Sequence, residues 1–415
     1  MSRSADAPGT LTLKPGRERS LRQRHPWIYS GAIARADPRL AAGDTADVLS
    51  ADGEWLARCA YSPASQIRAR VWTFDAREAV DAAFFARRIA QAAAARAPLR
   101  DPRHTGCRLV HGESDGLPGL VVDRYGATVV VQLGSAGADR WRDAIVDALV
   151  AIERPSAVYE RSDAEVRRLE GLEPRTGLLR GRLPETVAFV ENAIAFRVDV
   201  VAGQKTGFFL DQRPNRAAIA SVAAGARVLD LFCFSGGFAL SALAGGAAEV
   251  LAIDSSADAL ALARDNLARN PGLPGGRVEW READVFAELR RLRDRGAQFD
   301  LVIADPPKFA PTAAHAERAA RAYKDVNLLA LKLTRPGGIL ATFSCSGGVD
   351  AALFRRIVAG AAADARVEAT VVGRLAAGLD HPVTLAFPEG EYLKGLLLRK
   401  KDAAPGPAYA PAELS

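Results

Sequence analysis

The sequence is poor in cysteine, and its few cysteines lie far apart. The 415 residues include four of them, at spacings that fit neither a zinc knuckle nor a disulfide framework. We therefore expect reduced thiols and no bound metal, and at most one or two of these thiols can take part in chemistry. The sequence also lacks any apolar run of about eighteen residues, so no membrane-spanning helix is predicted.

The first ten residues lack the charged-then-apolar order of a signal peptide, and we expect a cytoplasmic protein. A chain of this length exceeds what one core usually fills, so two or three domains are expected. The net charge of +6 is modest, but arginine greatly outnumbers lysine. Arginine pairs well with phosphate, which favours an RNA partner. A GC-rich genome would produce the same composition, so charge alone leaves the two explanations about equal.

Residues 11–75 contain short strand-like segments separated by glycines, a pattern typical of a small β-barrel. A basic cluster lies early in this region and is followed by Trp27; its members are Lys14, Arg17, Arg19, Arg22 and Arg24. Basic side chains beside an aromatic ring suit RNA phosphates and a stacked base. The alternative is a solvated basic turn with Trp27 in the barrel core.

The middle of the chain predicts a small α+β domain, and the C-terminal part predicts a doubly wound α/β sheet. The middle has expected helices at 81–97 and 141–151, strands near 120–122, 128–131 and 157–159, and a hairpin at 187–200. Strict alternation then begins, with strands expected at 227–232, 249–254, 277–282, 299–304, 338–344, 366–373 and 392–399. We place the domains at 8–75, 76–184 and 185–401, followed by a disordered tail at 402–415.

An apolar run at 299–304 stops at Asp305, where two prolines prevent the strand from continuing. Ligands of open α/β sheets bind at the carboxyl ends of the strands. Asp305 is therefore placed to meet a substrate base or a cofactor. About forty residues later another buried strand runs into a small-residue turn that carries Cys345. An acid and a thiol at neighbouring strand ends would form an active site.

The first strand of the alternating region leads into a turn with paired glycines, Gly236 and Gly237. Paired glycines let backbone approach a ligand and open a helix, but the dinucleotide spacing G-x-G-x-x-G is absent. S-adenosylmethionine, which has no phosphate, suits such a turn better. Asp254 ends the next strand, where an acid accepts ribose hydroxyls, and Asp284 is placed to meet an adenine amine. Each acid could instead cap the helix that follows it.

Cys345 suggests covalent chemistry. Carbon 5 of a pyrimidine is a poor nucleophile until a thiolate adds at carbon 6, and this requires a reachable thiol at the substrate pocket. The alternative is a buried structural cysteine at a strand end. Cys233 lies inside the cofactor turn and fits a packing role better, and no role is assigned to Cys59 or Cys107.

Several motifs together resemble the 23S ribosomal RNA (cytosine-5)-methyltransferase family over nearly the whole chain. They are Arg24–Trp27, Tyr61–Arg70, Gly203–Arg213, Phe234–Phe238, Asp305–Phe309, Tyr323–Asn327, Phe343–Gly347 and Asp380–Val383. The resemblance implies a PUA domain, a small α+β domain and a Rossmann-like class I methyltransferase domain.

The resemblance also implies roles for individual residues. Cys345 would be the nucleophile, with Asp305 beside it at the base. The residues implied at the cofactor S-adenosyl-L-methionine are Gln212, Asp230, Phe232, Ser235, Gly236, Gly237, Asp254, Asp284 and Asp305. The implied substrate is 23S ribosomal RNA or a large-subunit assembly intermediate, with no DNA or membrane partner. Two rival hypotheses remain: a nitrogen-methylating enzyme, which has no need of Cys345, and a non-catalytic ribosome-assembly factor. The sequence does not indicate the oligomeric state.

Overall fold

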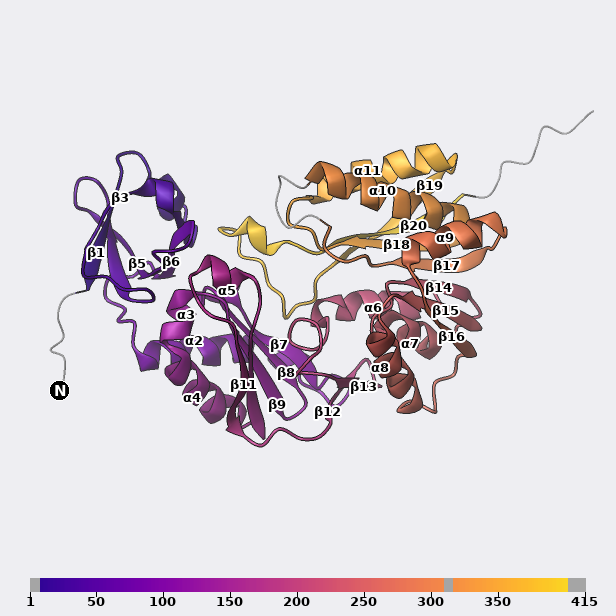
Figure 1. Cartoon of the computed structure of the whole chain (residues 1–415), viewed down its shortest axis with the longest axis horizontal. Helices are drawn as coiled ribbons and strands as arrows, with labels where there is room; N and C mark the ends of the chain where they lie inside the picture. Colours follow the sequence, from indigo (N-terminus) through magenta and orange to yellow (C-terminus); the bar gives the residue numbers. More distant parts are fainter. Residues whose placement is uncertain (1–7, 310–315, 402–415) are drawn as a thin grey trace, which may run out of the picture. The chain divides into compact units, whose positions relative to one another are not determined.

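The computed structural model describes residues 8–309 and 316–401 (Figure 1). Within this range the chain forms two compact units. The first unit extends to Arg213 and also includes Ala377–Glu391, and the second comprises Pro214–Ala376 and the chain from Tyr392 onward. The domain boundaries at 75/76 and 184/185 stay predictions, and the tail predicted at 402–415 lies outside the described residues.

The first unit begins with a small barrel-like sheet. Its strands, in the part of the chain described, are β1 (Gly9–Leu13), β2 (Trp27–Tyr29), β3 (Ile33–Ala36), β4 (Thr45–Leu49), β5 (Trp55–Tyr61) and β6 (Ile67–Thr73), in the order β2-β6-β5-β4-β1-β3. Only β1 and β4 pair in parallel. Alternate residues of β4 are buried, as expected for a strand with one face on a core. A single turn of helix, α1 (Arg19–Arg22), and a 3-10 turn, η1 (Ser30–Ala32), complete the barrel.

The remainder of the first unit is mixed α+β. Its elements are α2 (Ala82–Ala95), η2 (Ala97–Leu99), β7 (Gly106–His111), η3 (Gly112–Asp115), β8 (Leu120–Tyr125), β9 (Thr128–Leu133), α3 (Ala136–Arg140), α4 (Arg142–Glu153), β10 (Ala157–Ser162), α5 (Val166–Leu169), β11 (Arg175–Gly181), β12 (Val187–Glu191), β13 (Ile194–Val198) and η4 (Leu210–Gln212). Strands β7 to β11 form one sheet, and β12 and β13 form a hairpin. The Asp81 carboxylate caps α2 by accepting the Phe84 N–H at 2.8 Å.

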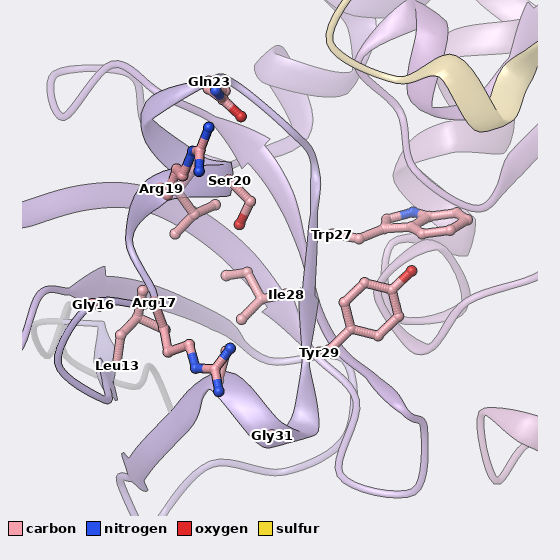
Figure 2. Close-up of a pocket in the computed structure, with 12 residues that line it drawn as sticks. Leu13, Gly16, Arg17, Arg19, Ser20, Gln23, Trp27, Ile28, Tyr29 and Gly31 are labelled. Atoms are coloured by element: carbon pink, nitrogen blue, oxygen red, sulfur yellow. The ribbon is translucent and has the colours of Figure 1, made fainter.

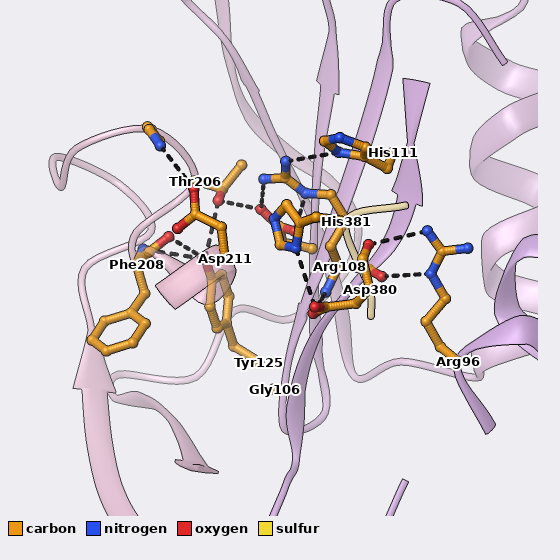
Figure 3. A network of polar contacts seen from close by, with 12 residues as sticks. Arg96, Gly106, Arg108, His111, Tyr125, Thr206, Phe208, Asp211, Asp380 and His381 are labelled. Atoms are coloured by element: carbon orange, nitrogen blue, oxygen red, sulfur yellow. Dashed lines mark hydrogen bonds and ion pairs between the residues drawn. The ribbon is translucent and has the colours of Figure 1, made fainter. Parts of the chain in front are cut away.

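A buried polar network holds the returning segment Ala377–Glu391 within the first unit (Figure 3). Asp380, which is 0% exposed, lies 2.7 Å from a guanidinium nitrogen of Arg213 and accepts the backbone N–H of Arg108 at 3.0 Å. Its other close partner is the His381 ring, at 3.1 Å. Burial alone would raise the pKa of Asp380, but the contacts with His381 and Arg213 outweigh burial and lower it.

The same network continues through a second histidine and a buried arginine. Burial, together with the charge of Arg108, lowers the pKa of His111 to about 2, so its ring is neutral at neutral pH. Arg96 is 1% exposed and pairs with both carboxylate oxygens of Asp115, each at 2.7 Å. It also donates to the Asp380 carbonyl at 3.1 Å. Every charge in this interior therefore has an opposite charge or a carbonyl beside it, as buried charges require.

The second unit is a doubly wound sheet with one antiparallel edge. Its described strands are β14 (Arg227–Leu231), β15 (Glu249–Asp254), β16 (Arg277–Glu282), β17 (Phe299–Ala304), β18 (Thr334–Ser344), β19 (Ala369–Ala376) and β20 (Lys394–Lys400), in the order β16-β15-β14-β17-β18-β20-β19. The first five of that order pair in parallel, and β20 runs antiparallel to both of its neighbours. The strand order reverses between β14 and β17, which makes this the topological switch point where such sheets bind ligands.

Helices cover both faces of this sheet (Figure 1). They are α6 (Arg213–Ala220), α7 (Gly237–Ala244), α8 (Ala257–Ala268), α9 (Val285–Asp294), α10 (Ala316–Leu333) and α11 (Ala351–Ala365). α7 and α8 pack on β14 to β16, while α9, α10 and α11 pack together on the opposite face. The main core lies under these last three helices and includes Leu229, Val302 and Leu340, all at most 1% exposed.

The predicted α/β fold class is confirmed, and the predicted strands of the second unit match the structure closely. Three described strands of the first unit, β3, β7 and β11, were not predicted. β7 escaped because Arg108 interrupts its apolar pattern; its half-buried side chain pairs with the buried Asp123 through two contacts of 2.8 Å. β11 escaped because it is largely exposed and contains two glycines, so that it shows no apolar alternation.

Candidate active site

The carboxyl ends of the parallel strands meet at one edge of the second unit's sheet. Leu231 of β14 pairs with Ala304 of β17, and Ala304 in turn pairs with Thr342 of β18. Asp305 therefore follows the paired row by one residue, and Cys345 follows it by three. The prediction that the acid and the thiol stand at the ends of neighbouring strands is confirmed.

The turn after β14 holds bulky residues in left-handed backbone conformations. Phe232 has φ 60° and Phe234 has φ 48°, and Gly236, which caps α7, has φ 83°. Non-glycine residues in this region are costly and tend to cluster at ligand sites. A Cβ on Gly236 would lie 2.8 Å from the Trp280 ring. The turn is therefore fixed in shape, with both phenylalanine side chains half-exposed at the sheet edge.

Asp254 supports this turn. One carboxylate oxygen accepts the Phe234 N–H at 2.8 Å, and the other accepts the Ser256 N–H at 2.9 Å. Ser256, not Asp254, caps α8, so the capping alternative for Asp254 is wrong. The half-buried carboxylate keeps further lone pairs that can accept hydroxyl groups.

Asp284 differs from Asp254 in that it does cap the helix that follows it, so the capping alternative is confirmed for Asp284. It is the N-cap of α9, and one of its oxygens accepts the Ala287 N–H at 2.8 Å. The residue is exposed beyond the end of β16. A capping carboxylate has a second oxygen, so the predicted contact with adenine stays a prediction.

Asp230 is fully buried without a geometrically sound hydrogen bond. Neither carboxylate oxygen has a hydrogen-bond partner among the described residues, although the Ala239 amide is near enough to oppose the pKa shift in part. Burial first, and then the charges of Asp305 and Asp254, raise the pKa of Asp230 well above its ordinary value. The Ser235 hydroxyl is likewise buried without a partner. Unsatisfied polar atoms beside a left-handed turn fit a site that completes its hydrogen bonds with a polar, partly cationic ligand such as S-adenosylmethionine.

Cys345 is the accessible cysteine. It is partly exposed, whereas Cys59, Cys107 and Cys233 are buried. Burial raises the pKa of Cys107 to about 11 and also raises the pKa of Cys59 and Cys233. The three buried thiols are therefore poor nucleophiles at neutral pH.

A row of neighbouring aromatic rings, which was not predicted from the sequence, borders this edge of the sheet between α9, β17 and α10. Phe286 lies 6.3 Å from Phe232 and 6.2 Å from Phe309, and Phe309 lies 4.9 Å from Tyr323, centroid to centroid. Tyr323 is 0% exposed, and its hydroxyl lies 2.9 Å from the Ser346 hydroxyl. These aromatic residues come from two helices and two loops far apart in the sequence, so no local pattern connects them and only the fold brings them together.

The predicted RNA-binding basic residues are exposed but divide into separate groups. Arg17 and Arg19 line a pocket of about 480 Å³ together with Trp27 and Tyr29 (Figure 2). Trp27 and Tyr29 project from one side of β2, while Arg17 and Arg19 lie toward the other. Lys14 is exposed close to these arginines in sequence.

Arg22, Arg24 and Trp27 already have contacts within the first unit. Arg22 pairs with Glu54, and the Arg24 guanidinium lies 5.0 Å above the Phe74 ring. Trp27 is half-buried; its indole N–H donates to Glu113 at 2.8 Å, and its ring meets Phe387 of the returning segment at 4.8 Å. Trp27 is therefore not a barrel-core residue.

Gln212 is buried in η4 of the first unit, and its predicted contact with the cofactor stays a prediction. No cluster of three or more His, Cys, Asp or Glu residues suited to a metal ion occurs in residues 8–309 and 316–401. Among these residues no helix is long and apolar enough to cross a membrane.

Comparisons with known proteins agree with this geometry. The family model for S-adenosylmethionine-dependent methyltransferases matches residues 173–375, and that for PUA-like domains matches residues 11–74. Among solved structures, a protein of Streptococcus mutans assigned as a SAM-dependent methyltransferase superposes with a TM-score of 0.78 at 20% identity, covering 94% of this chain and 99% of its own. At that identity the likeness shows the fold alone.

Two curated relatives are far more similar in sequence. The ribosomal RNA large subunit methyltransferase I of Shewanella denitrificans is 52% identical over 393 residues, which cover 94% of this chain and 98% of the relative. The protein of the same name from Photobacterium profundum is 50% identical over 390 residues, which cover 93% and 98%. The chain therefore belongs to the ribosomal RNA large subunit methyltransferase I family and is an S-adenosylmethionine-dependent methyltransferase with an N-terminal PUA-like domain.

Proposed function

We propose that this protein methylates carbon 5 of a cytosine in 23S ribosomal RNA, free or within a large-subunit assembly intermediate, through a covalent adduct with Cys345. The names of the curated relatives support a ribosomal RNA substrate. The observation that carries the chemistry is one accessible thiol at the end of β18, next to the strand that ends at Asp305, in a chain whose other three thiols are buried.

Bound S-adenosylmethionine supplies an electrophilic methyl group on a positively charged sulfur. The residues proposed to hold it are Gln212, Asp230, Phe232, Ser235, Gly236, Gly237, Asp254, Asp284 and Asp305. Asp254 accepts hydrogen bonds from the ribose hydroxyls with the carboxylate lone pairs that are not used by the Phe234 and Ser256 N–H groups. Asp230 accepts donors of the cofactor's cationic end, which satisfies a carboxylate that burial otherwise disfavours.

The chain's own residues then act on the base, which is flipped into the pocket. The Cys345 thiolate forms a bond to carbon 6, and the electron pair of the 5,6 double bond makes carbon 5 nucleophilic. Asp305 accepts the cytosine amine and, when protonated, donates to the ring nitrogen. After carbon 5 has gained the methyl group, a base removes its proton, the double bond re-forms and the bond between sulfur and carbon 6 breaks.

A Cys345→Ala variant tests this mechanism. Methylation of unmodified 23S ribosomal RNA should be abolished, while S-adenosylmethionine affinity measured by calorimetry stays within about twofold, because the cofactor's acids lie on other strands. Cys233→Ala is the matched control and should keep most of the activity. RNA with 5-fluorocytosine at the target should trap the wild-type enzyme as a stable adduct, because fluorine cannot leave as a proton.

Three results would each contradict a different part of the proposal. If Cys345→Ala methylates at a near wild-type rate, the product nucleoside should be a nitrogen-methylated base, and the covalent mechanism is wrong. If neither enzyme binds S-adenosylmethionine, the protein is a non-catalytic RNA-binding factor. If the wild-type enzyme methylates but forms no adduct with the fluorinated RNA, carbon 5 is not the target.

A further inference from the structure

Two loops at the carboxyl edge of the second unit's sheet carry the acid and the thiol of the proposed chemistry. The acid loop, Asp305–Phe309, follows β17, and the thiol loop, Cys345–Val349, follows β18. Both loops contact the same side chain, that of Tyr323 in α10, which has no part in the mechanism above. The mechanism needs the acid and the thiol at one base at the same time, so the rate depends on how the two loops are held.

Tyr323 lies on the buried face of α10. Residues three or four apart on a helix share a face, and the residues of this face are at most 1% exposed: Ala319, Tyr323, Val326 and Ala330. Its neighbours on the face are apolar, so a phenylalanine would fill the same space without bringing a hydroxyl into the core. A buried hydroxyl is costly unless it has a hydrogen-bond partner. The partner of the Tyr323 hydroxyl therefore decides whether tyrosine is favourable at this position.

That partner belongs to the thiol loop. The Tyr323 hydroxyl lies 2.9 Å from the hydroxyl of Ser346, the residue directly after Cys345. Ser346 is itself 0% exposed, and its carbonyl accepts the Val349 N–H at 3.1 Å. Burial, above all, raises the pKa of Tyr323, while the hydroxyls of Ser344 and Ser346 oppose the rise in part. The phenol is therefore protonated at neutral pH and has an O–H group to donate.

The Tyr323 ring contacts the acid loop. Its centroid lies 4.9 Å from that of the Phe309 ring, and the two rings meet edge to face at 62°. Phe309 follows Asp305 closely in the chain, with Pro306 and Pro307 between them. Proline fixes its own φ and restricts the residue before it, so this stretch has little backbone freedom. Fixing the Phe309 ring therefore also limits where Asp305 can lie.

We propose that Tyr323 is a positioning residue that joins the acid loop to the thiol loop, and so holds Asp305 and Cys345 in one arrangement around the same base. The inference rests on the proposed function, because it takes these two residues as the acid and the nucleophile. The competing explanation is that Tyr323 only stabilises the core, in which case removing its hydroxyl would affect unfolding but not turnover.

Tyr323→Phe tests the inference, because it keeps the ring contact with the acid loop and removes the hydroxyl contact with the thiol loop. We expect kcat for methylation of unmodified 23S ribosomal RNA to fall about tenfold or more, since a misplacement of about 1 Å can cost about 100-fold. Trapping by the 5-fluorocytosine RNA should slow in parallel. The affinity for S-adenosylmethionine, measured by calorimetry, should stay close to that of the wild type, because Asp254 and Asp284 follow other strands.

Thr334→Val is the matched control for a lost buried hydroxyl. Thr334 is 0% exposed, and its hydroxyl donates to the Ala330 carbonyl of α10 at 2.8 Å. It begins β18, so it lies at the edge of the sheet opposite to Cys345. Urea unfolding should show a loss of stability for both variants, whereas kcat should fall only for Tyr323→Phe.

A wild-type kcat in Tyr323→Phe, or an equal fall in Thr334→Val, overturns the proposal. If Tyr323→Phe does not fold, as judged by circular dichroism, Ser346→Ala takes its place with the same expectations, because it removes the other hydroxyl of the pair.

Amide deuterium exchange, without RNA or cofactor, separates this inference from the proposed function. Tyr323→Phe should speed exchange in peptides that cover the thiol loop, and Thr334→Val should not. Exchange that is unchanged in Tyr323→Phe contradicts the proposal even if the enzyme forms the adduct. A wild-type enzyme that forms no adduct with the fluorinated RNA contradicts the proposed function, and the exchange rates then decide whether Tyr323 holds the loop.

Discussion

At the scale of single residues, the second unit contains a carboxyl group, that of Asp230 near the carboxyl end of β14, which destabilises the fold at neutral pH. Asp230 is 0% exposed and its oxygens have no hydrogen-bond partner in the described part of the chain. Because its pKa is raised in the folded protein, the folded state binds a proton more tightly than the unfolded state does. The stability that Asp230 contributes through its favoured protonated form is fully present below the unfolded pKa of about 3.9. It is lost as pH rises through the raised pKa of the folded state. At neutral pH Asp230 therefore costs stability.

Asp230→Asn should have opposite effects on stability and on cofactor binding. The cofactor-free variant should be more stable than the wild type by about 1 kcal/mol or more at pH 7, with a smaller gain near pH 4, because the amide avoids a buried negative charge. Its affinity for S-adenosylmethionine should fall by about tenfold or more. Urea unfolding at the two pH values and calorimetry measure both effects. A variant that loses stability at pH 7 would show that Asp230 has a structural role.

At the scale of elements, the turn between β14 and α7 depends on Gly236, where any side chain would strain the backbone and collide with a neighbour. Gly236→Ala would place a Cβ against Trp280 and hold alanine at φ 83°. We expect a loss of about 1 to 3 kcal/mol in the free energy of unfolding, together with weaker cofactor binding. Gly272→Ala is the matched control, since nothing lies within 4 Å of its added Cβ. Equal stabilities of the two variants in urea unfolding would contradict the strain described for the turn.

The barrel's basic residues support a second prediction at this scale. Arg17 and Arg19 line the pocket of Figure 2, and the double variant Arg17→Ala/Arg19→Ala should weaken RNA binding. The slope of log K against log[salt] should fall by up to about 0.7 to 0.9 for each lost phosphate contact. Arg39→Ala/Arg77→Ala is a charge-matched control, because these side chains are exposed and already pair with Asp37 and Asp75.

Filter binding over a series of salt concentrations measures both double variants. Equal salt slopes for the two would place the arginines of the pocket on a solvated face and assign RNA binding to another part of the protein.

At the scale of the whole molecule, the chain leaves the first unit after Arg213 and returns to it for Ala377–Glu391. Arg213 is the last residue before the chain leaves the first unit, and its ion pair with Asp380 links it to the returning segment. Asp380→Asn should cost about 3 to 5 kcal/mol, because it leaves the Arg213 charge buried beside a neutral amide. Glu317→Gln, which removes an exposed pair with Arg321, should cost less than about 1 kcal/mol.

The sign of the pH dependence provides a second measurement of the same pair. Because the pKa of Asp380 is lowered in the folded state, its contribution is present above the unfolded pKa of about 3.9 and is lost as pH falls through the folded value. The stability gap between the wild type and Asp380→Asn, measured by thermal unfolding, should therefore narrow in acid. A gap that stays constant down to pH 2 would contradict the assigned ion pair.

The sequence by itself determined the strands of the second unit, the acids that end them and the thiol of Cys345. Buried parallel strands are continuous apolar runs, and a polar residue that stops such a run lies at the ligand-binding edge whatever the tertiary details. Motif resemblance supplied the family, and the comparisons confirmed it.

Only the tertiary structure decided which polar residues are buried and what they contact. Lys394 and Ser346 are 48 residues apart, and Arg96 and Asp380 are 284 apart, so no local pattern connects them. The same holds for the choice between a capping role and a site role. Asp254 and Asp284 look alike in sequence, yet Ser256 caps the helix that follows Asp254, whereas Asp284 itself caps the helix that follows it. These outcomes depend on how distant segments pack and pair their buried charges, which hydrophobic periodicity does not encode.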